Sequence, residues 1–407
     1  MKLRNTLSAI ALTASSLAII SCGEKTTSEA GPEYGLVAKF TPAQLINHLV
    51  DNVVVTNQQS FVSALEQQTA PINDYCAAIE QNSLIDEKRL AAQQAYTKTF
   101  SAWQLIEQIQ LAPLAKDDFA LRNKIYAWPS NSACGVDGEV ATHNSGTLNG
   151  FPYSISNRPN DRKGLFAQEY LLFNQSTDLT CATETGVLIG WSDLPEQTKL
   201  ARQCAFLQAT QTDLLSKVQN WQNTWQQGEN AYISELKNGD EQSAINVLGQ
   251  ALFYLDYQLK DSKLGCPLAS GPGDCPSSNH ANLVEARYAK LNKQAIEQNL
   301  KAFYQLFTGA TDTLAGDHED ALGFDDYLDA VGDKDTSDKI LQAITDAQAT
   351  LATITTDLGA AISTNNQDYA RYQTLQAQIK IATDLLKSDF SISLAVDLPD
   401  TSAGDND

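Results

Sequence analysis

Apolar residues recur at helical spacing along most of the chain. Between Ile340 and Ile362 they advance by three or four residues at each step, and the same spacing continues over residues 372–386. Such one-sided stripes are typical of amphipathic helices. Thr41 and Pro42 begin another helix, because threonine caps a helix start and proline is favoured at the first position. Long helices are predicted over residues 41–64, 85–112, 195–227, 240–263 and 283–308.

The alternation typical of strands is nearly absent. The one short candidate runs from Ser391 to Val396. Stretches rich in Gly, Asn, Ser or Pro predict loops at residues 129–162, 174–195 and 264–282. The second loop divides the helices into two sets. The sequence therefore predicts an all-α protein made of two packed helical bundles.

The N-terminus is typical of a targeting segment. Lys2 and Arg4 precede an apolar run that ends just before Cys22, as in a secretory signal peptide. A cysteine at this position resembles the bacterial lipobox, which implies that Cys22 is lipidated. The alternative is ordinary signal cleavage with an incidental cysteine. The resemblance implies a protein of the bacterial cell envelope, lipid-anchored and facing the periplasm, and Gly23 favours the outer membrane over the inner one.

These features divide the chain into parts. We expect a signal peptide at residues 1–21, a polar tether at 22–34, an N-terminal bundle at 35–190, a C-terminal bundle at 191–397 and an acidic tail at 398–407.

Charge limits the partners. The 407 residues include 28 Lys and Arg against 49 Asp and Glu, a net charge of −21. This excludes a nucleic-acid-binding protein, which needs a basic surface, and disfavours direct docking on anionic lipid. The membrane is therefore expected as a partner only through the lipid anchor.

Six cysteines follow Cys22, an even number that predicts disulfides in an exported protein. Fifteen pairings are conceivable. Spacing favours Cys266–Cys275 across a turn rich in Gly and Pro, with Cys181–Cys204 bracing a loop and Cys76–Cys134 left by elimination. A thiolate metal site is the alternative, but the spacings do not match those of zinc pairs.

Two carboxylates lie on faces that should be buried. Glu169 is in the middle of a segment that is apolar on nearly every side, and Gly164 begins it where the backbone must turn or approach closely. Glu107 shares a helix face with Trp103. Paired carboxylates could serve acid/base work or hold a metal, and a buried salt-bridge network is the alternative. The candidate partners of Glu169 are Arg158, Arg162, Lys263 and Arg287.

The segment from Gly164 to Phe173 resembles the signature of the imelysin family, also filed as peptidase family M75. The family pattern is Gly-x-His-x-x-Glu, and here Phe166 stands at the histidine position. The order of further segments strengthens the resemblance. They are Trp103 to Glu107 with Pro113, Ile125 to Pro129 with Asp137, Lys263 to Leu268, Glu285 to Tyr288, and Gly323 to Leu328.

The resemblance implies two helical bundles with a groove between them, and it suggests proteolysis or a link to iron uptake. Phe166 offers no lone pair to a metal, so we expect a non-catalytic binding protein for a small molecule, a peptide or a protein. One alternative is a metallopeptidase that holds iron or zinc through Glu169, Glu107 and a distant histidine such as His143. Another is a structural envelope protein. The predicted groove residues are Trp103, Glu107, Trp128, Asp137, Gly164, Phe166, Glu169, Lys263 and Arg287.

Overall fold

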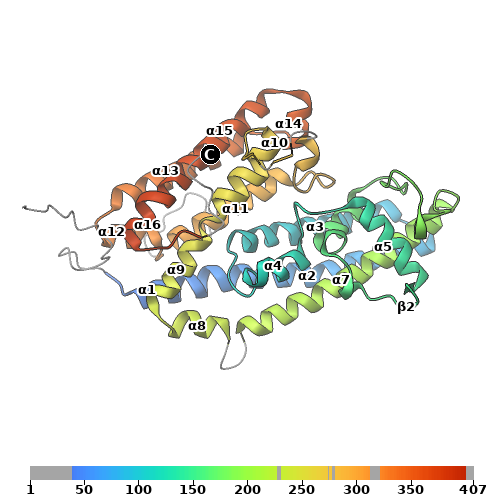
Figure 1. Cartoon of the computed structure of the whole chain (residues 1–407), viewed down its shortest axis with the longest axis horizontal. Helices are drawn as coiled ribbons and strands as arrows, with labels where there is room; N and C mark the ends of the chain where they lie inside the picture. Colours follow the sequence, from blue (N-terminus) through green and yellow to red (C-terminus); the bar gives the residue numbers. More distant parts are fainter. Residues whose placement is uncertain (1–38, 227–230, 274, 277–279, 312–320, 400–407) are drawn as a thin grey trace, which may run out of the picture.

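The computed structural model describes residues 39–226, 231–273, 275–276, 280–311 and 321–399. Helices dominate this part of the chain (Figure 1), so the all-α prediction is confirmed. The predicted signal peptide, the tether with Cys22 and the tail from residue 400 lie outside the described residues. Among the helices described, none combines the length and the apolar character that a membrane span requires.

The chain forms α-helices interrupted by short 3₁₀- and π-helical segments and one two-stranded sheet. The α-helices are α1 (Pro42–His48), α2 (Val55–Gln81), α3 (Ile85–Gln108), α4 (Lys116–Ile125), α5 (Ala133–Ser145), α6 (Gly164–Phe173), α7 (Glu196–Gln226), α8 (Tyr232–Asn238), α9 (Glu241–Ala251), α10 (Cys266–Leu268), α11 (Asn292–Thr308), α12 (Phe324–Ala330), α13 (Lys334–Thr353), α14 (Leu358–Thr364), α15 (Gln367–Leu385) and α16 (Ser391–Leu394). The π-helices are η2 (Leu49–Val54), η6 (Leu255–Gly265) and η8 (Leu386–Phe390), and the 3₁₀-helices are η3 (Ile155–Asn157), η4 (Asn160–Arg162), η5 (Gly186–Leu188) and η7 (His280–Leu283). Strands β1 (Thr147–Leu148) and β2 (Phe151–Pro152) pair antiparallel.

The first helix begins as predicted. Thr41 accepts a hydrogen bond from the amide of Gln44 at 3.3 Å, and the Gln44 side chain accepts one from the Thr41 amide at 2.8 Å. This capping box satisfies backbone groups that would otherwise lack partners. The helical path then continues through η2 and α2 to Gln81 and passes Pro71, so the predicted end near residue 64 was wrong.

Several other boundaries also differ from the predictions. The predicted helix 240–263 is α9 followed by a turn and η6, and the helix predicted over 283–308 begins only at Asn292. The stripe over 340–362 is divided between α13 and α14, because the Asp368 carboxylate binds the amides of Thr355 and Thr356 and holds the chain out of the helix there. Helical spacing is preserved across such breaks, which hides them in the sequence.

Two segments have a different secondary structure from the one predicted. The loop predicted over 129–162 contains α5, which Ser132 caps through the amide of Gly135, and the β1–β2 pair. The predicted strand at Ser391–Val396 begins as the short helix α16. In both places the tertiary contacts outweigh a weak local preference.

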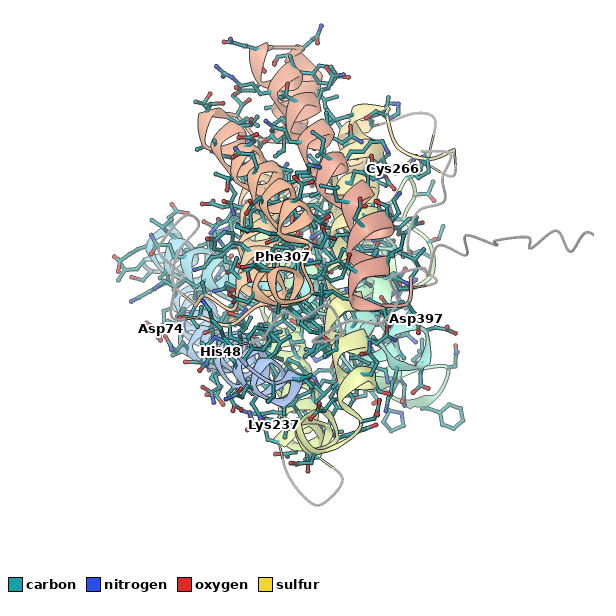
Figure 2. The ribbon with its side chains drawn as sticks, turned by 90° about the vertical axis from the view of Figure 1, so that its left-hand side faces the viewer. His48, Asp74, Lys237, Cys266, Phe307 and Asp397 are labelled. Carbon is teal, nitrogen blue, oxygen red and sulfur yellow. A yellow bond between two sulfur atoms is a disulfide. The ribbon has the colours of Figure 1, made fainter. Side chains whose placement is uncertain are left out.

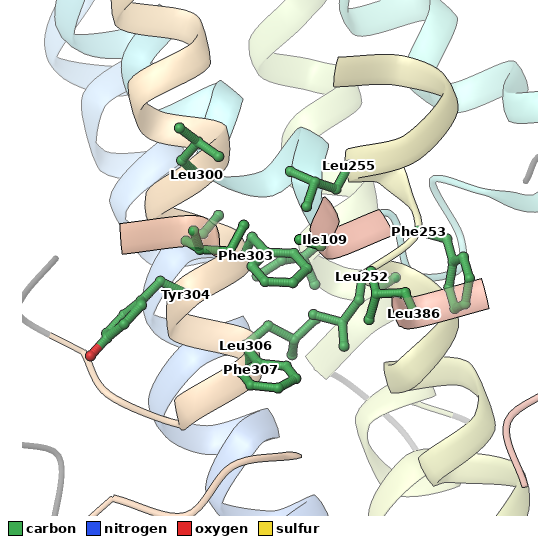
Figure 3. Close-up of a cluster of buried hydrophobic side chains, with 14 of the residues drawn as sticks. Ile109, Leu252, Phe253, Leu255, Leu300, Phe303, Tyr304, Leu306, Phe307 and Leu386 are labelled. Atoms are coloured by element: carbon green, nitrogen blue, oxygen red, sulfur yellow. The ribbon is translucent and has the colours of Figure 1, made fainter. Parts of the chain in front are cut away.

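Two hydrophobic cores organise the helices (Figure 1). The first lies among α2, α3, α5, α6 and α7, and the second among α9, η6, α11, α13 and α15. Figure 3 shows the second core, in which Phe303 of α11 packs among Leu252, Leu255 and Leu306. Ile109, at the end of α3, reaches into this core and links the two bundles.

The cores do not divide at the predicted boundary between residues 190 and 191. Helix α7 follows that point, yet its Phe206 and Leu214 lie in the first core. Residues 45–54 precede it, yet they lie in the second core. The loop at 174–195 was the clearest break in the sequence, but packing partners are set in space and not by order along the chain.

Three disulfides join the six cysteines of the described body. The predicted bond Cys266–Cys275 is confirmed. In Figure 2, Cys266 and Lys237 of α8 lie at opposite ends of the molecule. The other two predicted pairs were wrong: the bonds are Cys76–Cys204, between α2 and α7, and Cys134–Cys181, between α5 and the 174–195 loop. Since α2 packs on α7, these cysteines come to 5.5 Å between their Cα atoms.

Candidate functional site

Helix α6 carries the signature segment and is buried over most of its length. Gly164 begins it with a φ of +66°, and a Cβ there would collide with the carbonyl oxygen of Ile125. Any other residue would meet both the backbone strain and this contact. The close approach predicted at Gly164 is confirmed, and its role is to let α6 enter the core.

Glu169 points from α6 to the segment that precedes α11. The residue is 1% exposed, and its Oε1 accepts hydrogen bonds from the amides of Tyr288 at 2.9 Å and Ala289 at 3.2 Å. No ion pair of Glu169 is found among the described residues. The candidate cations are used elsewhere: Arg158 and Arg162 bind Glu139, Lys263 binds Glu107 and Glu285, and Arg287 stacks on Tyr288.

Burial dominates the electrostatics of Glu169. It raises the pKa of this carboxyl to about 7; the two amides and Arg287 oppose the shift, and Glu285 adds to it. A buried acid without a cation keeps its proton to a higher pH because the low-dielectric interior disfavours charge. Glu169 is therefore poised to change charge near neutral pH.

Lys263 is the centre of a second buried cluster, at the junction of α3, η6 and α11. Its Nζ lies 3.1 Å from Glu107 Oε2 and 3.0 Å from Glu285 Oε2. It also donates to the side-chain oxygens of Gln104 at 2.6 Å and Asn299 at 2.9 Å. We call this set, together with Arg122, the Lys263 network.

Arg122 of α4 completes the network by pairing with Glu107. Burial raises the pKa of Glu107, but Lys263 and Arg122 outweigh it and hold that pKa below its usual range. Burial also raises the pKa of Glu285; Lys263 opposes this, Glu107 adds to it, and the net result is a raised pKa. The two carboxylates share one lysine, and the one with a second cation is the more firmly ionised.

Aromatic rings surround the lysine. Its Nζ lies 5.9 Å from the centre of the Trp128 ring and 5.5 Å from that of Tyr254, within the range of a cation–π attraction. The hydroxyls of Tyr96 and Tyr126 are buried and have no hydrogen-bond partner among the described residues. Burial, and then the carboxylates Glu169 and Glu285, raise the pKa of both tyrosines well above the ordinary value.

The structure brings together only part of the predicted groove. Glu107, Trp128 and Lys263 are in contact through the Lys263 network, and Glu169 lies close enough to Glu285 for the two charges to interact. Trp103 instead packs on Phe61 in the first core, with ring centres 5.3 Å apart.

The other predicted groove residues make hydrogen bonds or ring contacts within the fold. Asp137 accepts from the Tyr170 hydroxyl and from the amide and hydroxyl of Thr180, so it fastens the 174–195 loop. Phe166 is 2% exposed and lies beside Tyr288, with ring centres 6.4 Å apart. Arg287 donates to the carbonyl of Asn282 and to the hydroxyl of Tyr288.

Sequence reasoning missed four members of the network: Gln104, Arg122, Glu285 and Asn299. Gln104 and Asn299 are uncharged polar residues on helices, which carry no distinctive signal. Glu285 lies in a segment that carries the family resemblance, and a charge there was visible. Arg122 lies in α4, which no pattern predicted as a separate helix.

A cavity of about 480 Å³ opens beside the network, between α4, α8, α9 and η6. Tyr254 lies between the two, since its ring faces Lys263 and also lines the cavity. The wall is apolar at Leu111 and Ala251 and polar at Gln110 and Gln258. We call this cavity the Tyr254 pocket. Its size and mixed lining are those of small-ligand sites in proteins.

The residues present do not fit the iron or zinc site that the metallopeptidase alternative requires. Within the described ranges, no group of three or more His, Cys, Asp and Glu side chains could hold a metal ion. The Glu169 Oε1 already accepts two amides, and Phe166 presents only carbon. His143, the loop histidine considered for this site, lies in α5 and contacts Tyr153 and Phe206.

Comparison with known proteins agrees with this architecture. The family model described as imelysin, peptidase M75, matches residues 55–386, which is most of the chain. The chain therefore belongs to the imelysin family. No protein of curated function matches it.

Solved structures share the fold at low sequence identity. An imelysin-like protein from Psychrobacter arcticum has a TM-score of 0.66 at 17% identity, with 89% of this chain and 99% of that chain covered. A structure named as an iron-regulated protein A precursor from Parabacteroides distasonis has a TM-score of 0.65 at 14% identity, with 86% of this chain and 95% of that chain covered. At these identities the likeness establishes the fold alone.

Proposed function

We propose that this imelysin-family protein is a non-catalytic binding protein of the bacterial envelope, with the Tyr254 pocket as its ligand site. The observation that carries the proposal is the position of that pocket, which lies at the junction of the two bundles and adjoins the buried Lys263 network at Tyr254. A rigid charged network behind an apolar wall holds the pocket in one shape. Such preorganisation favours binding because little order is lost when the ligand enters.

Binding is better supported than hydrolysis by the surroundings of the two signature carboxylates. A general base or acid must come within hydrogen-bond reach of the substrate. Glu107 and Glu169 are at most 1% exposed, and each already has partners: two cations for Glu107 and two amides for Glu169. Their arrangement is that of groups that hold the bundles together.

A structure with the same fold suggests the kind of ligand. One structural neighbour is named as an iron-regulated protein. We extend this to the present chain as a proposal that its ligand belongs to iron acquisition. The pocket offers hydroxyl and carboxamide groups and an apolar wall, so the ligand would be a small organic molecule and not a bare metal ion.

The proposed location rests on Cys22. If Cys22 carries the lipid, the substitution Cys22→Ser should release the protein from membranes or leave it unprocessed. Fractionation of cells followed by immunoblotting reads this outcome. Unchanged membrane attachment of the variant would contradict the proposed anchor.

The binding proposal is tested by native mass spectrometry of protein purified from its own envelope. We expect a bound small molecule on the wild type and its loss from Val247→Trp, because Val247 lines the pocket and the larger ring would fill it. Ser363→Trp adds the same ring at an exposed site on α14 and should keep the ligand. A wild-type protein whose measured mass shows no bound ligand would contradict the proposal. So would a ligand that stays bound to Val247→Trp.

A further inference from the structure

A groove of about 470 Å³ lies between α13 and α15. These two helices pack side by side on the part of the second bundle that faces away from the first (Figure 1). Each helical path lines the groove with four residues at the spacing i, i+3, i+4 and i+7. They are Lys339, Gln342, Ala343 and Asp346 from α13, and Ile381, Asp384, Leu385 and Ser388 from α15 and η8. Residues at this spacing share one face of a helix, so the groove lies between two matched helical faces.

The groove has an apolar floor and an apolar wall. Ala343 is 5% exposed, and its small side chain leaves room on the α13 side, while Ile381 is 54% exposed on the α15 side. The row continues from Ile381 through Leu385 and Ser388 to Ile392, which is 55% exposed, in steps of four, three and four residues. This row is about 16 Å long, or three helical turns. Large apolar side chains that follow one another along an exposed face mark an interaction surface.

The lysines beside the groove are already paired. Lys339 pairs with Asp335 within α13, and Lys380 pairs with Asp384 at 3.0 Å within α15. Lys387 lies farther from Asp384, at 4.0 Å. Each of these cations therefore has a carboxylate nearby, and none is left over for the remaining acids of the rim.

Two further carboxylates at the rim have no ion pair among the described residues. Asp346 accepts a hydrogen bond from the side-chain amide of Gln342 at 2.8 Å, and Asp389 accepts one from Ser388 at 3.0 Å. Asp389 lies at the Lys339 end of the groove, since its charge helps to raise the pKa of that lysine. Asp346 is seven residues beyond Lys339, about 10 Å along the helix. A partner that covers the groove meets an unpaired carboxylate at each end.

The shape and charge of the groove favour a basic helix. A third helix laid between two neighbouring helices packs its ridge of side chains into their groove. A lipid surface fits less well, because the carboxylates repel anionic headgroups. A second copy of this chain also fits less well, because a symmetric pair would bring the same acidic rim against itself.

We propose that the groove between α13 and α15 docks an amphipathic helix of a partner protein. Its apolar side chains would lie against Ala343, Ile381 and Leu385, and its lysine or arginine side chains would approach Asp346 and Asp389. Apolar burial supplies the affinity, and the charges select and orient the partner. The groove shares no lining residue with the Tyr254 pocket, so this proposal stands apart from the proposed function.

The test uses the full chain and a fluorescent synthetic peptide of about 15 residues, or four helical turns. Leucines form one face of this peptide and lysines form the other. Fluorescence anisotropy should show binding that weakens at high salt, because salt screens exposed charges. A peptide with the same leucines and glutamates in place of the lysines should bind at least about tenfold more weakly. So should a lysine peptide whose leucines are scrambled off the common face.

Variants of the protein locate the peptide. Ile381→Ser should weaken binding about tenfold, as expected when a large apolar contact is lost. Ile189→Ser removes an isoleucine that is even more exposed, outside the groove, and is the matched control that should change nothing. Asp346→Asn should weaken binding severalfold at low salt only. Asp74→Asn, which removes an exposed carboxylate of α2, should leave binding unchanged.

Several results would overturn the proposal. They are no binding of the lysine peptide, equal binding of the glutamate or scrambled peptide, binding that salt leaves unchanged, and equal binding to Ile381→Ser and Ile189→Ser. Sedimentation of the protein with phosphatidylglycerol vesicles that Ile381→Ser abolishes would assign the groove to lipid and would overturn it as well.

Discussion

Glu107 and Glu169 are both fully buried near the junction of the bundles, yet the protein treats their charges in opposite ways. Glu107 lies between Lys263 and Arg122, and its pKa is held below the usual range. Glu169 meets two backbone amides and no cation among the described residues, and burial raises its pKa to about 7. One carboxylate is a fixed charge and the other is a proton carrier.

The difference follows from which carboxylates have a paired cation. Lys263 pairs with Glu107 and Glu285, and Arg122 pairs with Glu107, whereas Glu169 has no ion pair among the described residues. Without a paired cation, burial favours a proton on Glu169. Backbone amides stabilise Glu169 in either form, since its oxygen can accept hydrogen bonds with or without the proton.

The largest effect is expected when the shared cation is removed. Lys263→Met keeps the shape of the side chain but leaves Glu285 without a cation and Glu107 with Arg122 alone. Breaking a buried pair in this way typically costs about 3–5 kcal/mol, which urea unfolding would measure. Lys380→Met breaks the exposed pair with Asp384 and should cost less than about 1 kcal/mol. Equal losses in the two variants would contradict the role of the network.

Glu169→Gln should have an effect that depends on pH. Because the folded-state pKa of Glu169 is raised from 4.5 to about 7, the folded protein binds more protons than the unfolded chain within that window. Wild-type stability should therefore fall as the pH rises from 4.5 to 7, by about 3 kcal/mol from this group. Glutamine does not titrate, so the stability of the variant relative to the wild type should rise by that amount. A difference that is flat with pH would show that Glu169 is ionised throughout.

Phe166→His restores the family histidine three residues before Glu169. Phe166 is buried against Tyr288, so the imidazole would lose apolar contact and need a partner in the interior. We expect a loss of about 2 kcal/mol and no gain in zinc or iron affinity by isothermal titration calorimetry. Tight metal binding that depends on Glu169 would show that the site is a latent metal centre.

The smallest effect is expected for Arg287→Gln. Arg287 lowers the pKa of Glu169, but it is the smallest of the influences on that pKa. The two side chains form no ion pair among the described residues; Arg287 lies over the Tyr288 ring. The free energy of unfolding should change by less than about 1 kcal/mol. A loss of several kcal/mol would make Arg287 the missing partner of Glu169 and remove the contrast with Glu107.

The sequence predicted which carboxylates are buried but not how each is neutralised. The apolar surroundings of Glu169 and the aromatic face of Glu107 are periodic patterns, and both residues are buried as those patterns indicate. The partners come from other helices, and helical periodicity gives no information about which helices touch. Lys263 was one of four candidate partners considered for Glu169, and it pairs with Glu107 and Glu285 instead. The backbone amides that hold Glu169 have no sequence signal at all.

The same limit explains why two disulfides and the contacts of the segment 394–399 could not be predicted. Cys266 and Cys275 are close along the chain, and this pair could be predicted. Cys76 and Cys204 are 128 residues apart and pair because α2 packs on α7. The segment 394–399 was predicted in part as a strand; its backbone contacts lie on α9 and not on another strand, which alternation alone cannot reveal.

The central claim, that Glu169 carries a proton where Glu107 does not, is tested most directly by carboxyl ¹³C NMR on protein labelled at glutamate. The resonance that disappears in Glu169→Gln identifies Glu169, and the one that disappears in Glu107→Gln identifies Glu107. We expect the Glu169 resonance to titrate with a midpoint near pH 7 and the Glu107 resonance to titrate below the usual glutamate range. A Glu169 midpoint at or below about 4.3, the ordinary value for glutamate, would contradict the account.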